Sequence, residues 1–470
     1  MRFAQGTFVS LKAGDVIHPV ESGTVYFFGG FFNAEGELTS FVTRASDYIM
    51  PEDGDFYLCA RNPEGSAIED IDELASRLVI IRPANVTART GALEAQSASH
   101  ESRLIEKETE HLKPNCSYYA NGLIRMAYNP YKLGGSLALT GQLHCHTKHK
   151  DSEGNSVYYG GTDASAMQLY KDCGYDFLTV TNYGHMGEIY RPAEGTMPEG
   201  LTWLCDGQEA AINGSGTPGA SAFPCKHSCV FNTKEAYPWM PEMEWQDWVD
   251  ITKHKGEIIT IAHPSWSNTY QRPDVLEKIQ GRIRFCEVFN GLTNYSYKQG
   301  RQTDNGYPMC TFPEGKDDDF AWEILLDKGC VTWGIAVSDA HTCNNATEIK
   351  RGCVKVFADH NERMEILQNL CTGNFYSSTN TAVSINGISF ENGVLTIQTG
   401  NAEAVTKFIG EGGEVFSMVT GTVATYMMNG SEMYVRAVIV FPDEEQVWTQ
   451  PIINLFTRDY DDLFEERLIG

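Results

Sequence analysis

The feature that most constrains the fold is an alternation of strand-like and helix-like segments from about residue 134 onwards. Asp163 is a suitable N-cap for a helix that ends at Gly174, and the buried strand 177–180 follows. The same alternation predicts further segments at 242–255 (helix), 258–261 (strand), 273–280 (helix), 284–289 (strand), 319–328 (helix) and 331–337 (strand). Strands separated by helices pair in parallel, so this region predicts an α/β fold with a parallel sheet, open or closed as a barrel.

The two flanking regions have a different sequence pattern. Short apolar runs separated by turn residues before about residue 83 predict a β-rich, sandwich-like domain, and 84–115 is a polar connector. After about residue 378, runs at 384–388 and 394–397 flank a turn signal, and 432–440 alternates as a strand. We therefore expect three parts: an N-terminal β domain with its connector (1–115), the α/β region (116–378) and a small C-terminal β domain (379–470).

The charge restricts the class of partner. The chain carries 36 basic and 62 acidic residues, a formal charge of −26. Such a field repels nucleic acids and anionic membranes, so neither is an expected partner. An anionic substrate is compatible with this charge where bound cations invert the local field.

Cysteine usage and hydropathy bear on the compartment. No apolar run approaches the ~18–20 residues that span a bilayer, and the first residues lack the basic and apolar regions of a secretory signal. The 13 cysteines include no CxxC pair. The segment Cys225–Cys229, with His227 between them, has no matching second pair that would close a zinc site. Reduced thiols and a cytoplasmic location are expected.

Histidines and carboxylates follow the predicted strands of the middle region. His144 and His146 are two apart in an extended segment, so their side chains point to the same side. In a parallel barrel the strand ends converge on one face. Imidazole and carboxylate ligands suit Mn, Fe or Zn, and a bridging carboxylate holds two such ions close together. The predicted metal-site residues are His144, His146, Asp151, His185, Glu209, His263, Glu287, Asp339 and His341.

The order of these motifs resembles the polymerase and histidinol phosphatase (PHP) family of metal-dependent phosphoesterases. That family has an HxH with a following Asp, then Thr-Asp-His, Gly-x-Glu, Ala-His-Pro and Ser-Asp-x-His. The matching segments here are LHCHTKHKD, Thr181-Asn182-Tyr183, Gly207-Gln208-Glu209, Ala262-His263-Pro264 and Ser338-Asp339-Ala340-His341. The resemblance covers about 140–345 and implies a distorted (β/α)7 barrel with two or three divalent metal ions. The C-terminal region is also similar to the domain that trails the barrel in a branch related to carbamate-ester hydrolases.

The resemblance assigns ligands by position. His144, His146, Glu209 and Asp339 would hold a first ion, and Glu209 would bridge to a second ion completed by His263 and Glu287. Asp151 and His341 would hold a third ion together with the histidine of the second motif.

The chain departs from the family at that second motif, because Asn182 and Tyr183 replace Asp-His. Either His185 supplies the missing imidazole, or the third site is weak or empty. His227 resembles a position near the active face and is either substrate-facing or structural.

The function implied is a phosphoesterase that releases phosphate from a small organic molecule. A metal-bridging hydroxide would attack phosphorus, and Asp339, His341 and His185 are the predicted catalytic residues. Lys148, Lys150 and Arg191 are near enough in sequence to contact phosphate, or are surface charges. Two alternatives stay open: a carboxyl-ester, carbamate-ester or amide hydrolase that uses the same metals, and a non-catalytic β-sandwich binding protein with a decayed barrel. The oligomeric state is not predicted.

Overall fold

The chain forms two compact units, Met1–Ile105 and Glu106–Gly470. The computed structural model describes residues 115–121, 123–151, 153–212, 226–240, 242–266, 273–279, 283–293 and 318–455, together with the backbone of eight strands between 7 and 81. Nearly all of the predicted connector 84–115 and Cys225 lie outside the described residues. In the described part, no helix combines the length and the apolar character needed to cross a bilayer.

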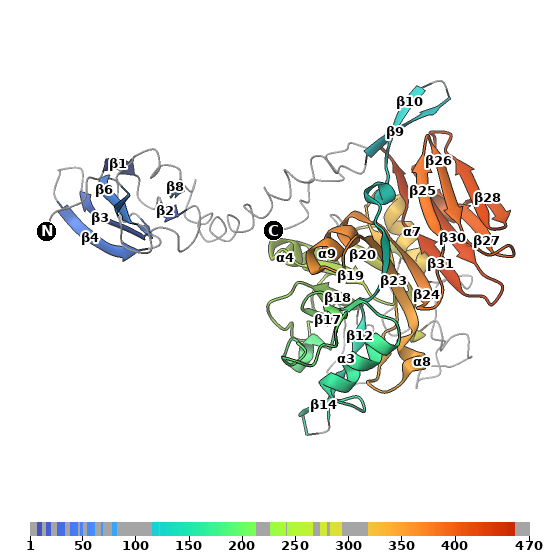
Figure 1. Ribbon diagram of the computed structural model, residues 1–470, viewed down its shortest axis with the longest axis horizontal. Coiled ribbons are helices and arrows are strands. Elements are labelled where there is room, and N and C mark those ends of the chain that lie inside the picture. Colours follow the sequence, from blue (N-terminus) through green and yellow to red (C-terminus); the bar gives the residue numbers. More distant parts are fainter. Residues whose placement is uncertain are drawn as a thin grey trace. The chain divides into compact units, whose positions relative to one another are not determined.

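The first unit is built of antiparallel β-strands, drawn in blue in Figure 1. One sheet has the order β1-β6-β3-β4, with β7 paired to β6, and the other has the order β5-β2-β8. The described residues of this part all lie in strands, while the bounds of an N-terminal β domain and its sandwich packing stay predictions. These strands are β1 Thr7–Leu11, β2 Val16–Pro19, β3 Tyr26–Phe32, β4 Leu38–Ala45, β5 Tyr48–Ile49, β6 Gly54–Arg61, β7 Ala67–Ile68 and β8 Leu78–Ile81.

The second unit is mixed α/β, with more strand than helix (Figure 1). Its helices are α3 Asp163–Asp172, α4 Trp245–His254, α5 Pro273–Leu276, α7 Asp319–Asp327, α8 Ala346–Ile349 and α9 Arg363–Thr372, with short 3-10 turns at η1 Pro130–Leu133, η2 Gly184–Met186 and η4 Glu411–Gly413. Its strands up to the last predicted barrel strand are β9 Asn115–Ala120, β10 Leu123–Tyr128, β11 Leu137–Gln142, β12 Cys145–His146, β13 Lys148–Lys150, β14 Ser156–Tyr158, β15 Phe177–Leu178, β16 Thr202–Trp203, β17 Gly207–Ile212, β18 Lys226–Phe231, β19 Ile258–Ile261, β20 Phe285–Asn290 and β21 Trp333–Val337. The later strands are β22 Ala340–His341, β23 Arg351–Ala358, β24 Phe375–Asn380, β25 Gly387–Glu391, β26 Val394–Gln398, β27 Val405–Ile409, β28 Val415–Thr420, β29 Val423–Met427, β30 Tyr434–Val440, β31 Gln446–Thr449 and β32 Ile452–Asn454.

The strands of the predicted barrel form two sheets, and the described residues do not show a closed (β/α)7 barrel. One sheet contains the parallel strands β11, β15 and β16, and the other has the order β17-β18-β19-β20-β21. In the second sheet β18 runs antiparallel to both β17 and β19. A parallel pair needs a crossover, usually a helix, whereas the chain between β17 and β18 reads NGSGTPGASAFPC, and such glycine- and proline-rich sequence disfavours a helix.

The predicted helix α3 begins as expected but has a different cap. The Oγ1 atom of Thr162 accepts from the backbone N–H of Ser165, and the Ser165 hydroxyl oxygen accepts from the backbone N–H of Thr162. This reciprocal pair is a capping box, so Thr162 takes the position that we assigned to Asp163. Asp163 instead accepts hydrogen bonds from the Tyr158 and Tyr190 hydroxyls.

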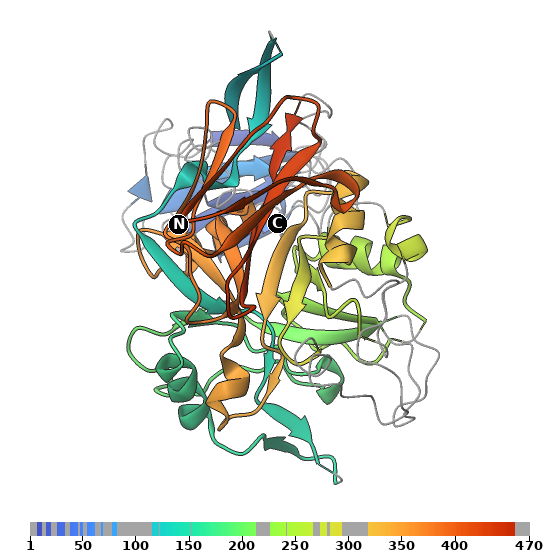
Figure 2. The same cartoon turned by 90° about the vertical axis from the view of Figure 1, so that its right-hand side faces the viewer.

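The C-terminal strands continue the large sheet of the α/β region. β24 pairs with β23 on one side and with β31 on the other, and β30 and β27 follow. The predicted hairpin is present as β25 and β26, labelled in Figure 1, and these strands pair with β29 in a separate three-stranded sheet. Figure 2 shows the C-terminal strands, drawn in orange to red, from a second side. Residue 378 lies inside β24. The domain boundary that we placed there stays a prediction.

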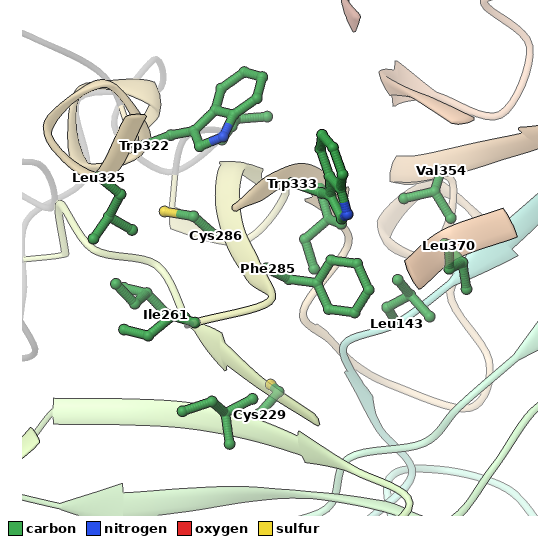
Figure 3. Packing of buried hydrophobic residues seen from close by; sticks show 14 of the residues in the cluster. Leu143, Cys229, Ile261, Phe285, Cys286, Trp322, Leu325, Trp333, Val354 and Leu370 are labelled. Carbon is green, nitrogen blue, oxygen red and sulfur yellow. The ribbon is translucent and has the colours of Figure 1, made fainter. Parts of the chain in front are cut away.

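A core of large side chains supports the strands that lead to the candidate site (Figure 3). Trp322 and Trp333 are fully buried, and their indole N–H groups donate to the carbonyls of Thr332 and Cys371. Tyr128 stacks on Trp333 with 5.8 Å between ring centroids. Buried aromatic side chains contribute strongly to stability, so β20 and β21 are held on a rigid base.

Candidate metal centre

The ends of β11 and β21 lie side by side, which brings distant motifs together. β12 and β22 pair in parallel, with His146 opposite His341. The backbone N–H of Asp339 donates to the carbonyl of His144 across 2.9 Å. The HxH motif and the Ser-Asp-x-His motif therefore meet at one edge, as the strand-end argument predicts.

Two of the candidate residues have left-handed backbone conformations. His263 has φ +27° and Asp339 has φ +48°. Such conformations are costly for residues other than glycine and persist where surrounding contacts hold them, often at functional sites. Here Glu287 Oε2 accepts from the backbone N–H of His263 across 2.6 Å. Both side chains are thereby directed by a constrained backbone at the end of a strand.

Four side chains converge on a first position. The Nε2 atoms of His144 and His146 are 3.3 Å apart, and each is 3.3 Å from Asp339 Oδ1. Glu209 Oε2 lies 3.2 Å from His146 Nε2 and 3.6 Å from His144 Nε2. All four residues are buried.

Glu209 also forms a second position with its other oxygen. Oε1 lies 2.5 Å from His227 Nδ1 and 3.0 Å from His263 Nε2. One carboxylate thus divides its two oxygens between two pairs of imidazoles. This is the arrangement of a carboxylate that bridges two cations.

Burial and hydrogen bonding fit the first position to a cation. Glu209 Oε2 and Asp339 Oδ1 are buried, and neither accepts a hydrogen bond within the part of the chain that the structure describes. Buried polar atoms are nearly always satisfied, so these two oxygens indicate a missing positive partner. Imidazole nitrogen together with carboxylate oxygen is a donor set for Mn, Fe or Zn.

The charged groups of the cluster are coupled: the carboxylates favour protonated imidazoles, and the imidazoles favour ionised carboxylates. Burial alone would lower the pKa of His144, but Asp339 and the other nearby carboxylates raise it well above its usual value. Burial alone would raise the pKa of the Glu209 carboxyl, but His227 and His144 hold it well below its usual range. Asp339 behaves in the same way beside His144 and His146, and its pKa is lowered. The carboxylates are therefore ionised and able to bind a cation.

Glu287 lies behind His144, on the Nδ1 side of its ring. Its Oε1 is 2.6 Å from His144 Nδ1, and its Oε2 accepts from the backbone of His263 and from Asn290 Nδ2. Asn290 Nδ2 also lies 3.2 Å from Asp339 Oδ2. Glu287 and Asn290 thus orient His144 Nε2 and Asp339 Oδ1 toward the first position. Metal-ligating histidines typically have such a partner on their second nitrogen.

His341 lies at the more exposed edge of the cluster. Its ring stacks on His146, with centroids 4.2 Å apart, and its side chain is 24% exposed. Its Nδ1 is 2.9 Å from the carbonyl of Asp339, and its Nε2 is 3.0 Å from the Tyr183 hydroxyl. Burial, followed by the neighbouring His146, lowers the pKa of His341 to about 4.

Two predicted ligands of the third ion are placed elsewhere. Asp151 lies between β13 and β14, where its carboxylate accepts from Glu153 and Asn155. His185 lies in η2, is exposed, and stacks on Tyr183 with 5.3 Å between ring centroids. Among the described residues, neither belongs to a group of converging ligand atoms.

The basic side chains that we predicted to contact phosphate also have partners of their own. The Lys148 ammonium lies over the Tyr158 and Tyr190 rings, 4.9 and 5.4 Å from their centroids. Arg191 pairs with Asp206, and the Lys150 ammonium donates to the Ser156 hydroxyl.

His227 and Cys229 belong to the site but were not among the predicted ligands. In the β17–β18 ladder Glu209 is opposite Cys229 and Ala211 is opposite His227. Residues two apart on a strand share a face, so both side chains lie on the face that carries Glu209. The His-x-Cys spacing contained this signal, but its use required the pairing of β17 with β18.

Comparisons with known proteins leave the family open. No family profile matches the chain, and the search of curated proteins found no match. The chain is 14% identical to a two-domain protein from Bacteroides vulgatus ATCC 8482 that contains a predicted PHP-like metal-dependent phosphoesterase; the match covers 68% of this chain and 95% of that one, with a TM-score of 0.34. It is 12% identical to PsfC from Pseudomonas syringae PB-5123, over 48% of this chain and 86% of that one, with a TM-score of 0.29. TM-scores this low assign neither a fold nor a function.

Proposed function

We propose that this protein is a divalent-cation-dependent hydrolase of the PHP type that releases phosphate from a small organic phosphate ester. The observation that carries the proposal is the division of the two Glu209 oxygens between two imidazole pairs. Oε2 faces His144 and His146, and Oε1 faces His227 and His263. The alternative of a non-catalytic binding protein does not account for the convergence of these five side chains, most of them buried.

Some residues of the centre would be metal ligands, and others orient those ligands. His144, His146 and Asp339 would hold one cation, His227 and His263 would hold a second, and Glu209 would bridge them. When bound, the pair of cations would lower the pKa of water and neutralise charge that develops on the substrate oxygens. Glu287 and Asn290 fix the orientation of the ligands, since their bonds reach the far sides of His144 and Asp339.

Because the chain is strongly acidic, an anionic substrate would be attracted only where bound metal ions supply positive charge. The chain has a formal charge of −26, and Lys148 and Arg191 are engaged with their own neighbours. A phosphate group would therefore be bound chiefly by the metal centre. Tyr183 and His341 lie at the more exposed edge of the centre, where they are hydrogen-bonded to each other.

The test is a substrate screen on protein loaded with Mn²⁺ or Zn²⁺. Phosphomonoesters, phosphodiesters, carboxyl esters and carbamate esters are assayed in parallel, with an Asp339→Asn variant beside the wild type. We expect phosphate release that is lost by orders of magnitude in the variant. Asp359→Asn is the matched control, because Asp359 is a surface carboxylate that accepts from the Ser136 backbone, and it should keep full activity.

Two outcomes would contradict the proposal. Cleavage of carbonyl esters without phosphate release would replace the phosphoesterase with the alternative ester hydrolase. No hydrolysis of any class by metal-loaded protein would remove the enzyme altogether.

A further inference from the structure

We infer that this centre holds two cations, and that a hydrogen-bonded Tyr183–His341 pair occupies the place where a third would be bound. The inference rests on the proposed function. It concerns the residues that the PHP resemblance assigns to a third ion, and it follows from what those residues contact in this chain.

The hydrogen bonds of His341 fix its tautomer. Its Nδ1 faces the backbone carbonyl of Asp339 at 2.9 Å, and a carbonyl oxygen only accepts. Nδ1 therefore carries the proton, and in the neutral ring Nε2 is the acceptor. The Tyr183 hydroxyl, 3.0 Å away, must then donate to Nε2. Both nitrogens of His341 are satisfied without a metal.

Tyr183 is held firmly in that position. Its ring stacks on His146 with centroids 4.5 Å apart, and its backbone forms a parallel bridge with Glu209. Its hydroxyl is a neutral phenol that donates its one proton to His341 Nε2. A neutral phenol is a poor ligand for a cation beside imidazole.

Asn182, which replaces the acidic residue of the family motif, has a structural role. Its Oδ1 accepts from the backbone N–H groups of Thr147 and Lys148 at 2.9 and 3.1 Å. Its Nδ2 donates to Thr147 Oγ1 at 3.2 Å. The Asn182 amide thus links the segment after β15 to the residues that follow His146. Both its oxygen and its nitrogen already have hydrogen-bond partners there.

The remaining ligand atoms are insufficient for a third cation. His146, Asp339 and His341 do form a converging group, but His146 Nε2 and Asp339 Oδ1 also define the first position. Asp151 accepts three hydrogen bonds within its own loop. A third cation would need to break the Tyr183–His341 bond and the Asp151 turn together.

The experiment counts metal ions per chain. Metal-free protein is saturated with Mn²⁺ or Zn²⁺, freed of excess metal, and measured by inductively coupled plasma mass spectrometry against protein concentration. The wild type, Tyr183→Phe and His341→Gln should each bind two ions, because neither side chain is a ligand. Glu209→Gln should bind fewer than two, which shows that the method detects the loss of a true ligand.

The outcomes separate this inference from the proposed function. Three ions in the wild type together with hydrolysis would overturn the inference and leave the function intact. A loss of one ion in His341→Gln, with the wild type at two, would also overturn it, because His341 would then be a ligand. Fewer than two ions in the wild type and no hydrolysis would contradict the two-cation centre and the function together.

Discussion

Substitution of Glu287 by Gln tests whether this residue positions the ligands or is a ligand itself. Glu287 Oε1 bonds His144 Nδ1 at 2.6 Å, and Oε2 bonds the backbone N–H of His263 at 2.6 Å. The amide oxygen of Gln can keep the bond to His144 without the negative charge. Its NH₂ group cannot accept from His263, so that buried N–H loses its partner.

The magnitude follows from these two bonds. Mutation of the residue that orients a metal-ligating histidine typically weakens metal binding by about 10–100-fold, or roughly 1.4–2.7 kcal/mol, and here the negative charge behind His144 is lost. An unsatisfied buried N–H costs about 1–3 kcal/mol of folding stability. We therefore expect both a lower metal affinity and a lower free energy of unfolding, while the number of ions bound at saturation stays at two.

The assay is a titration of metal-free protein against a competing chelator, with urea unfolding measured in parallel. Glu257→Gln is the matched control, because this half-buried carboxylate accepts from the Tyr237 hydroxyl and takes no part in the cluster. A saturating count of one ion would show that Glu287 is a ligand, as the family resemblance implies. An unchanged metal affinity would refute the positioning role.

Three further predictions concern charge and backbone. Since burial lowers the pKa of His341 to about 4, against about 6.5 in the unfolded chain, only the unfolded chain takes up this proton between those values, and stability falls as pH falls through that window. In urea unfolding of metal-free protein, the free energy of unfolding of the wild type should fall by about 3 kcal/mol more than that of His341→Gln between pH 7 and pH 4. If the free energies of unfolding of the two proteins depend equally on pH, the lowered pKa of His341 is contradicted. Gly352 has φ +72°, and an added Cβ would lie 2.1 Å from the Val337 carbonyl oxygen, so Gly352→Ala should lower the melting temperature, and an unchanged value would refute the close approach. Arg436 is buried against Glu323 and over the Trp322 ring, so Arg436→Ala should cost about 3–5 kcal/mol in urea unfolding, and a loss below 1 kcal/mol would contradict a structural ion pair.

The sequence anticipated the parts of the site that depend on local periodicity. His144 and His146 converge because alternate residues of an extended segment share a side. His263 and Asp339 follow β19 and β21, which lie on either side of β20, and both come together with His144. These arguments need only a strand and its end.

The parts that depend on pairing between strands were harder to predict. His227 faces Glu209 only because β18 runs antiparallel to β17, which the expected parallel barrel excluded. Asp151 has the spacing of a ligand, but the β13–β14 hairpin turns its carboxylate into its own loop. Glu287 lies on the expected strand, and whether it contacts a metal or a histidine depends on side-chain distances that no sequence pattern specifies.

The most direct test of the two-cation centre is anomalous diffraction from crystals of the protein loaded with Mn²⁺ or Zn²⁺. We expect two peaks on either side of Glu209, one among His144, His146 and Asp339 and the other between His227 and His263. A single peak, or peaks away from Glu209, would contradict the account.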